Sequence, residues 1–189
     1  MNTTPPNDST VLQEEARRAY ETEEYALAAE RYTLAADSLR KNKDNVTAAE
    51  MANNAAVAWL QAKHADKALA CLQGTPEIFG SANDKRRQAM AFGNTGTALE
   101  ELKRLPEALE CFENSSTIFK EIGEKDMRAE VLRRISSLQV RTGKRLDAIV
   151  SMQAALQSKT KLSLKDHILK GLFNILFKLL RSGGNPISY

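Results

Sequence analysis

At 189 residues the chain has the length of a single domain, and its 42% hydrophobic content is ordinary for a soluble globular protein. The net charge of +3 is unevenly spread. Residues 1–124 hold 14 Lys and Arg against 20 Asp and Glu (−6), whereas residues 125–189 hold 13 against 4 (+9). This asymmetry can steer an acidic partner toward the C-terminal part or let copies stack head to tail, although a solvated basic face is the more common outcome.

The first ten residues, MNTTPPNDST, contain no basic region followed by an apolar run. We therefore expect no secretory signal, and we expect a cytoplasmic protein. Two prolines among Asn, Asp, Ser and Thr predict a disordered tail over residues 1–8. The first helix is expected to be capped near Ser9 or Thr10.

The first predicted helix pair spans about residues 9–44, with a turn at Glu23 and Glu24. The second spans about 45–83 and is irregular, because Gly74, Thr75 and Pro76 fall where its second helix should continue. A proline inside a helix removes a hydrogen bond and clashes with the preceding turn. We expect this helix to stop near Gln73 and the following residues, including Phe79, to form a short turn.

The third helix pair, about residues 84–123, shows the pattern most plainly. Its first helix carries Gly96 and Leu99 on one face, and its second carries Ala108 and Phe112. The small residues, Gly96 and Ala108, stand where the two helices would cross most closely, and the bulky ones stand where the crossing opens. A fourth pair covers about residues 124–160, with its turn at Gly143 and Lys144.

The four pairs repeat with a constant period of 40 residues. Small or apolar residues recur at Ala16, Ala56, Gly96 and Ser136, at Ala28, Ala68, Ala108 and Ala148, and at Tyr32, Leu72, Phe112 and Met152. This spacing resembles the tetratricopeptide repeat (TPR), in a 40-residue form similar to that of the Leu-Gly-Asn repeat proteins and kinesin light chains. The resemblance implies an all-α, right-handed superhelix of four helix pairs, forming one domain over residues 9–181.

A last helix is predicted over residues 163–181, followed by a C-terminal tail over 182–189. In phase with the repeats, Leu172 and Ile175 take the positions of core residues, so this helix is expected to cap the stack. It leaves an apolar flank that no further helix covers, formed by Leu169, Phe173, Phe177 and Leu180. Three hypotheses remain open for this flank: a partly exposed cap, self-association or binding of another protein, and interfacial membrane binding. Charged residues within the helix argue against a membrane span.

The TPR resemblance implies that the first helix of each pair lines a concave groove that binds peptides. On this chain the predicted peptide-binding residues are Arg17, Asn53, Asn54, Asn94, Arg133, Arg134 and Arg141. Asparagines one repeat apart could pair with the amides of an extended peptide, and the arginines could hold carboxylates. The alternatives are asparagines that hydrogen-bond within the stack and arginines that are simply solvated.

The sequence offers little support for other activities. Cys71 and Cys111 occupy equivalent places in adjacent repeats, too far apart for a disulfide, and with only two histidines they do not form a zinc site. No phosphate-binding loop or nucleophile motif is present. The basic C-terminal part lacks the interleaved aromatic residues typical of nucleic-acid binding.

We therefore expect a non-enzymatic scaffold, without metal or cofactor, that binds a peptide segment of a protein partner, with a preference for acidic segments. The alternative functions are self-association, for instance as a homodimer, through the C-terminal helix, and interfacial membrane association.

Overall fold

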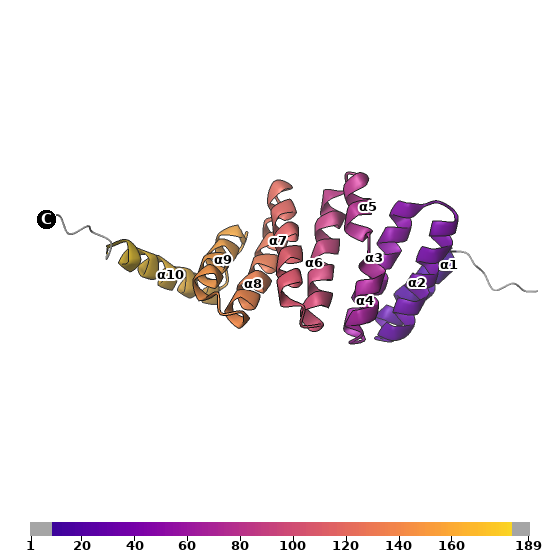
Figure 1. Ribbon diagram of the computed structural model, residues 1–189, viewed down its shortest axis with the longest axis horizontal. Coiled ribbons are helices and arrows are strands. Elements are labelled where there is room, and N and C mark those ends of the chain that lie inside the picture. Colours follow the sequence, from indigo (N-terminus) through magenta and orange to yellow (C-terminus); the bar gives the residue numbers. More distant parts are fainter. Residues whose placement is uncertain (1–8, 183–189) are drawn as a thin grey trace, which may run out of the picture. The chain divides into compact units, whose positions relative to one another are not determined.

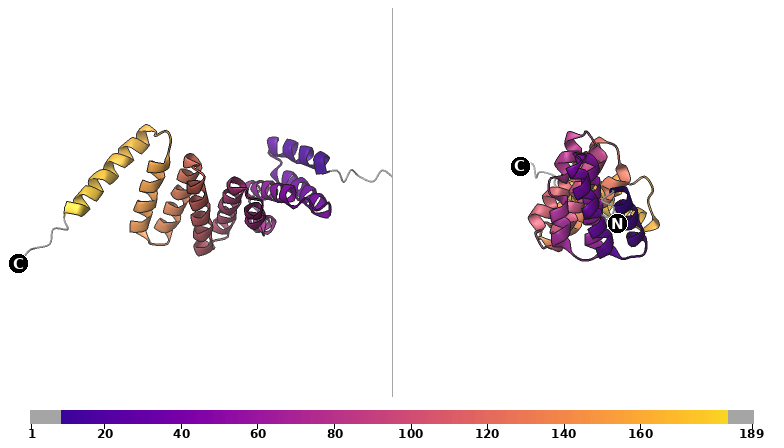
Figure 2. Two further views of the ribbon diagram at one scale, coloured as in Figure 1. Left: turned by 90° about the horizontal axis from the view of Figure 1, so that it is seen from above. Right: turned by 90° about the vertical axis from the view of Figure 1, so that its right-hand side faces the viewer.

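The structure is a computed structural model that describes residues 9–182, and in this range it is entirely helical. The predicted tail over residues 1–8, and that over 182–189 apart from Ser182, lie outside the described residues. Within each helix pair the two helices lie side by side (Figures 1 and 2). The helices are α1 (Ser9–Glu21), α2 (Tyr25–Lys41), α3 (Asn45–Gln61), α4 (Ala65–Leu72), α5 (Thr75–Ser81), α6 (Lys85–Glu101), α7 (Leu105–Glu121), α8 (Lys125–Arg141), α9 (Arg145–Ser158) and α10 (Leu164–Ser182).

Contacts divide the described chain into two compact units. The first contains α1–α7 and ends at Gly123, and the second contains α8–α10 and begins at Glu124. The division falls at the predicted boundary between the third and fourth repeats. Each unit is built from the predicted helix pairs, and the organisation of residues 9–181 as one domain stays a prediction.

The helix ends follow a strict rhythm. A residue with positive φ closes a helix every 20 positions, at Glu23, Lys43, Lys63, Asn83, Lys103, Gly123 and Gly143. A left-handed residue just beyond a helix lets the next backbone N–H groups reach the last free carbonyl groups. At the first of these turns, for example, the N–H of Glu24 donates to the carbonyl of Ala19 at 2.8 Å. The 40-residue sequence period is therefore two 20-residue helix-and-turn units.

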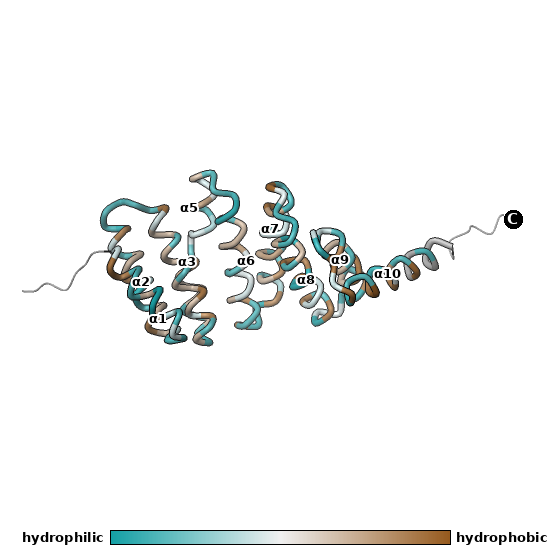
Figure 3. The backbone as a smooth tube through the Cα atoms, turned by 180° about the vertical axis from the view of Figure 1, so that it is seen from behind, coloured by the Kyte–Doolittle hydropathy of each residue, from teal (hydrophilic) through white to brown (hydrophobic). Residues whose placement is uncertain are grey.

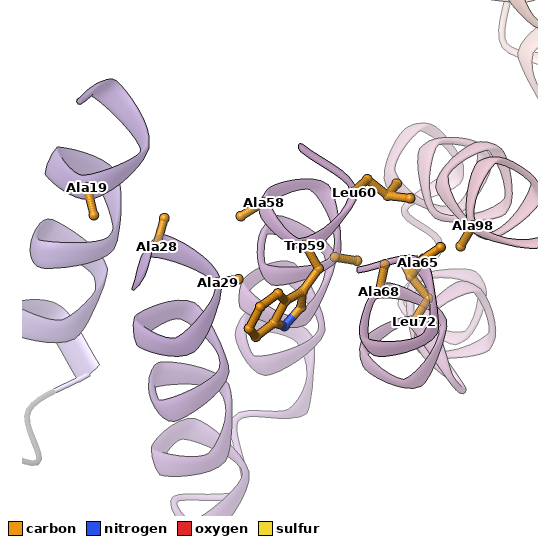
Figure 4. Close-up of a cluster of buried hydrophobic side chains, with 11 residues drawn as sticks. Ala19, Ala28, Ala29, Ala58, Trp59, Leu60, Ala65, Ala68, Leu72 and Ala98 are labelled. Carbon is orange, nitrogen blue, oxygen red and sulfur yellow. The ribbon is translucent and has the colours of Figure 1, made fainter. Parts of the chain in front are cut away.

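The core of the first unit is built largely from alanine. Figure 4 shows Trp59 of α3 among small side chains from four neighbouring helices. Alanine lets the helix backbones approach closely, and the Trp59 ring fills the space that remains. In the third pair, Gly96 serves the same purpose, because a Cβ atom there would lie 2.8 Å from Cε1 of the buried Phe112 ring. From the sequence, Phe112 was expected where the crossing opens, but in the structure the Phe112 ring packs directly on Gly96.

The second repeat is interrupted as expected. Helix α4 ends at Leu72, the chain turns at Gly74 with a φ of 74°, and α5 then begins with Pro76 in its first turn, where proline needs no N–H donor. The expectation of a simple turn after Gln73 was wrong, because residues 75–81 form a helix of 7 residues. The cause is the buried Phe79, which packs with Ala49 and Ala91 and holds this segment against α3 and α6.

In the second unit, α8 and α9 form a helix pair and α10 packs against α9. The Ser136 hydroxyl donates to the carbonyl of Ala148 at 2.7 Å. Ser136, one of the small residues that recur every 40 positions, therefore also links α8 to α9. The linker before α10 is held by side chains: Asp126 accepts from the N–H of Thr160 at 2.9 Å and from its hydroxyl at 2.6 Å. At the start of α10, Asp166 accepts from Lys159 Nζ at 2.7 Å and from the Ser163 N–H at 2.9 Å.

The orientation of α10 differs from the expectation. Leu172 and Ile175, expected to lie inward, are 58% and 60% exposed, whereas Leu169 and Phe173 are half-buried. The side chains of Phe177 and Leu180 lie outside the described residues. Hydrophobic residues recur along most of α10 (Figure 3), so several rotations about the helix axis would bury an apolar strip. The linker contacts at Asp126 and Asp166 select a different rotation from the one that the repeat period implies.

Candidate functional site

The predicted peptide-binding residues of the first unit centre on the seam between α3 and α6. There the side-chain amide of Asn94 donates to the side-chain oxygen of Asn53 at 2.9 Å. Asn53 is only 9% exposed, so this bond satisfies a group that has little access to water. The two residues are 41 positions apart, so Asn94 pairs with the neighbour of its repeat equivalent, Asn54, and not with Asn54 itself. For Asn53 and Asn94 the structure therefore shows the alternative use, a hydrogen bond between two helices of the stack.

A second polar contact crosses the same seam one to two turns away. Arg87 of α6 forms an ion pair with Glu50 of α3 at 3.3 Å, and it also lies 3.4 Å from Asp84 at the start of its own helix. Asp84 caps α6 by accepting from the backbone N–H of Arg87 at 3.0 Å. Because these pairs are solvent-exposed, each contributes little to stability. Of these contacts, the Arg87–Glu50 pair joins α6 to α3.

Asn54 is the amide that the stack leaves available. Its side chain is half-buried, and within the described residues it makes no hydrogen bond. On α6, the hydroxyl of Thr97 is already used, because it donates to the carbonyl of Gly93 at 3.0 Å. An unused carboxamide offers two donors and an acceptor. Asn54 can therefore bind a peptide amide without breaking an internal contact.

Arg17 of α1 is already paired with acidic neighbours. Its guanidinium lies 2.7 Å from Glu14 and 2.5 Å from Glu21 on the same helix. The bond from Arg17 holds the pKa of Glu14 below its ordinary value, and the same bond raises the pKa of Arg17. A ligand carboxylate would have to displace these partners, so Arg17 is less suited to ligand binding than the sequence indicated.

The predicted arginines of the fourth repeat all lie on α8, in the second unit. Arg133 is exposed and donates to Glu130 at 2.8 Å, which occupies part of its guanidinium. Arg134 and Arg141 also have interaction partners within the described residues. These three residues are therefore a basic surface on one helix of the second unit.

The first unit also has a pocket away from these residues. An open, mostly apolar pocket of about 550 Å³ lies where the second repeat is interrupted, between α4, the start of α5, α6 and α7. Its walls include Leu69, Leu72, Pro76, Phe92 and Cys111. None of the predicted peptide-binding residues lines it. The sequence did predict that the second helix of this repeat is interrupted at Gly74, Thr75 and Pro76. An interrupted helix does not by itself indicate a pocket.

The two cysteines are free thiols, as expected. Burial raises the pKa of both Cys71 and Cys111, and for Cys111 the nearby carboxylates of Glu110, Glu107 and Glu77 raise it further. Such thiols are weak nucleophiles at neutral pH. Among residues 9–182, no cluster of three or more His, Cys, Asp or Glu side chains could hold a metal ion. In the same range, no helix has the length and apolar content needed to cross a membrane.

These features define the class of protein: an all-α helical-repeat protein of the TPR-like type, as the 40-residue period predicted. The chain belongs to the soluble NSF attachment protein (SNAP) family, whose sequence model matches residues 7–179. The structural neighbours below share this helical-repeat fold.

Two of the solved structures that resemble this chain are RapI and BtubC. The apo form of RapI superposes with a TM-score of 0.72 at 16% sequence identity, over 90% of this chain and 50% of RapI. BtubC (BKLC) from P. vanneervenii superposes with a TM-score of 0.56 at 16% identity, over 87% of this chain and 80% of BtubC. At such identity the likeness concerns the fold. The chain spans about half the length of RapI.

Proposed function

We propose that this protein is a cytoplasmic, non-enzymatic scaffold that binds a peptide segment of a protein partner on the α3–α6 face of its first unit. In this proposal the Asn54 carboxamide pairs with main-chain amide groups of the peptide. The Asn53–Asn94 bond holds α3 and α6 in the register that presents Asn54. Because a main-chain contact does not read side chains, the face would accept several sequences.

The observation that carries this proposal is the half-buried Asn54 side chain, which has no hydrogen-bond partner among the described residues. A polar group in that position costs free energy unless water or a ligand satisfies it. Membership of the SNAP family supports a protein partner, since the family is named for attachment to NSF. For this chain we propose only that it attaches to another protein.

The test compares Asn54→Ala with Asn114→Ala as matched control. Asn114 is an exposed asparagine on α7, so both variants lose the same carboxamide. Tagged full-length proteins would be used to capture partners from the native cell, and the captured proteins would be quantified. We expect Asn54→Ala to lose partners that wild type and Asn114→Ala retain. Equal recovery by all three proteins would contradict the proposal.

The basic surface of α8 gives this scaffold its proposed preference for acidic partners. Arg133, Arg134 and Arg141 lie in the part of the sequence that carries a balance of +9 over residues 125–189. Exposed charge of one sign raises the rate of encounter with partners of the opposite sign, and salt screens the effect. Changing the three arginines to Gln should slow association with an acidic partner at low salt and leave the rate at high salt nearly unchanged.

A second candidate function is self-association through α10. An exposed apolar stripe, formed by Leu164, Ile168, Leu172 and Ile175, runs along this helix, each side chain being 58% to 79% exposed. An exposed apolar surface of this kind usually marks an interface. Sedimentation at increasing protein concentration tests this function: an Ile168→Glu/Leu172→Glu variant should remain monomeric where wild type associates. A monomeric wild type throughout would contradict it.

A further inference from the structure

We propose that the pocket at the interruption of the second repeat is the docking site for the α10 stripe of a second copy of this chain. This inference rests on the self-association proposed for α10, and it names the surface that the stripe contacts. The assembly would be head to tail, with the second unit of one copy bound to the first unit of the next.

The pocket exists because one helix is short. The second helices of the first and third repeats, α2 and α7, have 17 residues each, whereas α4 has 8. The chain leaves the α4 axis at Gly74, and Leu69, Leu72 and Phe92 then line a space that a continuing helix would otherwise border. This space is apolar at its base and open to one side, which suits side chains presented by another helix.

The charges around the pocket are mainly negative. Asp66 and Glu77 line it directly, and Glu107 and Glu110 lie close enough to influence Cys111 in its wall. The one basic residue in the lining, Arg104, forms an ion pair with Glu107, so its charge is compensated locally. The rim therefore favours an apolar segment that carries basic residues.

The α10 helix has the matching properties. Its sequence contains four basic residues and one acidic residue, Asp166, which is already paired with Lys159 at 2.7 Å. The basic residues are Lys165, Lys170, Lys178 and Arg181. A basic helix with an exposed apolar stripe is thus available on the same molecule that carries an acidic rim around an apolar pocket.

The dimensions also agree. A volume of about 550 Å³ corresponds to a sphere about 10 Å across, within the size range of ligand pockets. On α10, Ile168 and Ile175 are separated by seven residues, about 10 Å along the helix axis. The pocket can therefore receive two or three consecutive side chains of the stripe.

The proposed contact is heterologous, because a pocket on one copy receives a helix from another. Such contacts leave one free pocket and one free helix in every complex, so association continues beyond the dimer unless a ring closes. A symmetric contact between two α10 helices would stop at the dimer. The size of the largest species therefore separates the two arrangements.

The experiment uses two full-length variants, each lacking one half of the contact. Asp66→Lys/Glu77→Lys reverses the charge of the rim at two exposed positions and leaves α10 intact. Ile168→Glu/Leu172→Glu removes the stripe and leaves the pocket intact. The control, Glu30→Lys/Glu113→Lys, makes the same change of charge at exposed positions outside the pocket lining. Circular dichroism would establish that all variants are folded.

In sedimentation velocity at low salt, wild type and control should form species larger than a dimer as concentration rises, and about 0.5 M salt should weaken them. Each contact variant alone should be monomeric, and an equimolar mixture of the two should form a 1:1 complex. If the stripe variant is monomeric but the rim variant associates like wild type, self-association stands and the docking site is wrong. A wild type that stops at the dimer, or a mixture that forms no complex, would also overturn the inference.

Discussion

Asn94 donates its side-chain amide to Asn53 at 2.9 Å, and this bond joins α6 to α3 near the middle of both helices. Asn53 is almost fully buried, and Asn54 beside it makes no hydrogen bond within the described residues. Two adjacent asparagines therefore have different roles: the first holds the repeats together, and the second is available to a ligand. This difference underlies the first prediction.

Asn94→Ala should destabilise the first unit by about 1 to 3 kcal/mol, because it leaves the buried oxygen of Asn53 without its partner. Asn54→Ala should change the free energy of unfolding by less than about 0.5 kcal/mol, since no internal contact is lost. Urea denaturation followed by circular dichroism measures both. Equal stability of the two variants would show that the Asn53–Asn94 bond does not distinguish the residues.

Gly96→Ala should be destabilising although alanine favours helices. Its Cβ would lie 2.8 Å from the buried Phe112 ring, and such overpacking costs about 1 to 3 kcal/mol, against about 1 kcal/mol gained in helix propensity. The matched control is Gly93→Ala on the same helix, whose Cβ would meet only the Ser115 hydroxyl, at 3.4 Å. We expect a lower urea midpoint for Gly96→Ala and an equal or higher one for Gly93→Ala. The reverse order would refute the packing argument.

Lys103→Gly should raise the thermal midpoint. Lys103 closes α6 with a φ of 64°, a conformation that costs a residue with a Cβ about 1 to 2 kcal/mol. Glycine removes this cost but loses about 0.5 to 1 kcal/mol through the greater entropy of the unfolded chain, so the net gain should be about 1 kcal/mol or less. Differential scanning calorimetry would measure it. Lys120→Gly, inside α7, is the control and should lower the midpoint.

The start of α10 should respond to acid through Asp166. Bonds from Lys159 and Ser163 hold the pKa of this carboxyl well below its ordinary value. Because the folded-state pKa is lowered, the stabilisation is fully present above the unfolded value of about 3.9 and is lost as the pH falls through the folded one. The protection of the first-turn amides of α10, measured as their exchange rate relative to an unstructured peptide at the same pH, should therefore be unchanged at pH 5 and fall only below about pH 4.

Asp166→Asn provides the comparison for the acid response. This variant lacks the carboxylate, so the first turn of α10 should be weakly protected already at pH 7, and its protection relative to an unstructured peptide at the same pH should change little down to pH 3. An acid response as large as that of wild type would mean that another group, and not Asp166, holds the linker.

The sequence predicted the repeats well because their signal is local and periodic. The recurring buried alanines, the small residue at Gly96 and the end of α4 near Gln73 all follow from residue size, helical spacing and proline geometry. The turns were harder to place, because several of the residues with positive φ are Lys or Glu, which do not mark such positions. Of the seven residues that close helices at 20-residue intervals, only Asn83, Gly123 and Gly143 carry the usual signal.

The parts that could not be predicted depend on how helices are rotated against each other. A repeat period aligns Asn94 with Asn54, but the contact across the seam is made with Asn53, because facing positions on adjacent helices are offset by one residue. The rotation of α10 is set by the contacts of Asp126 and Asp166 in the linker, which the period does not contain. The pocket beside α4 likewise follows from the path of the chain after Gly74.

The central claim is that Asn54 presents a free amide to a bound peptide, and the most direct measurement is the affinity of a captured partner's binding segment for wild type and Asn54→Ala. Fluorescence anisotropy with a labelled synthetic segment would supply it, with Asn114→Ala as control. We expect Asn54→Ala to bind about fivefold to tenfold more weakly, the loss of one or two hydrogen bonds, and the control to bind like wild type. Unchanged affinity of Asn54→Ala would contradict the account.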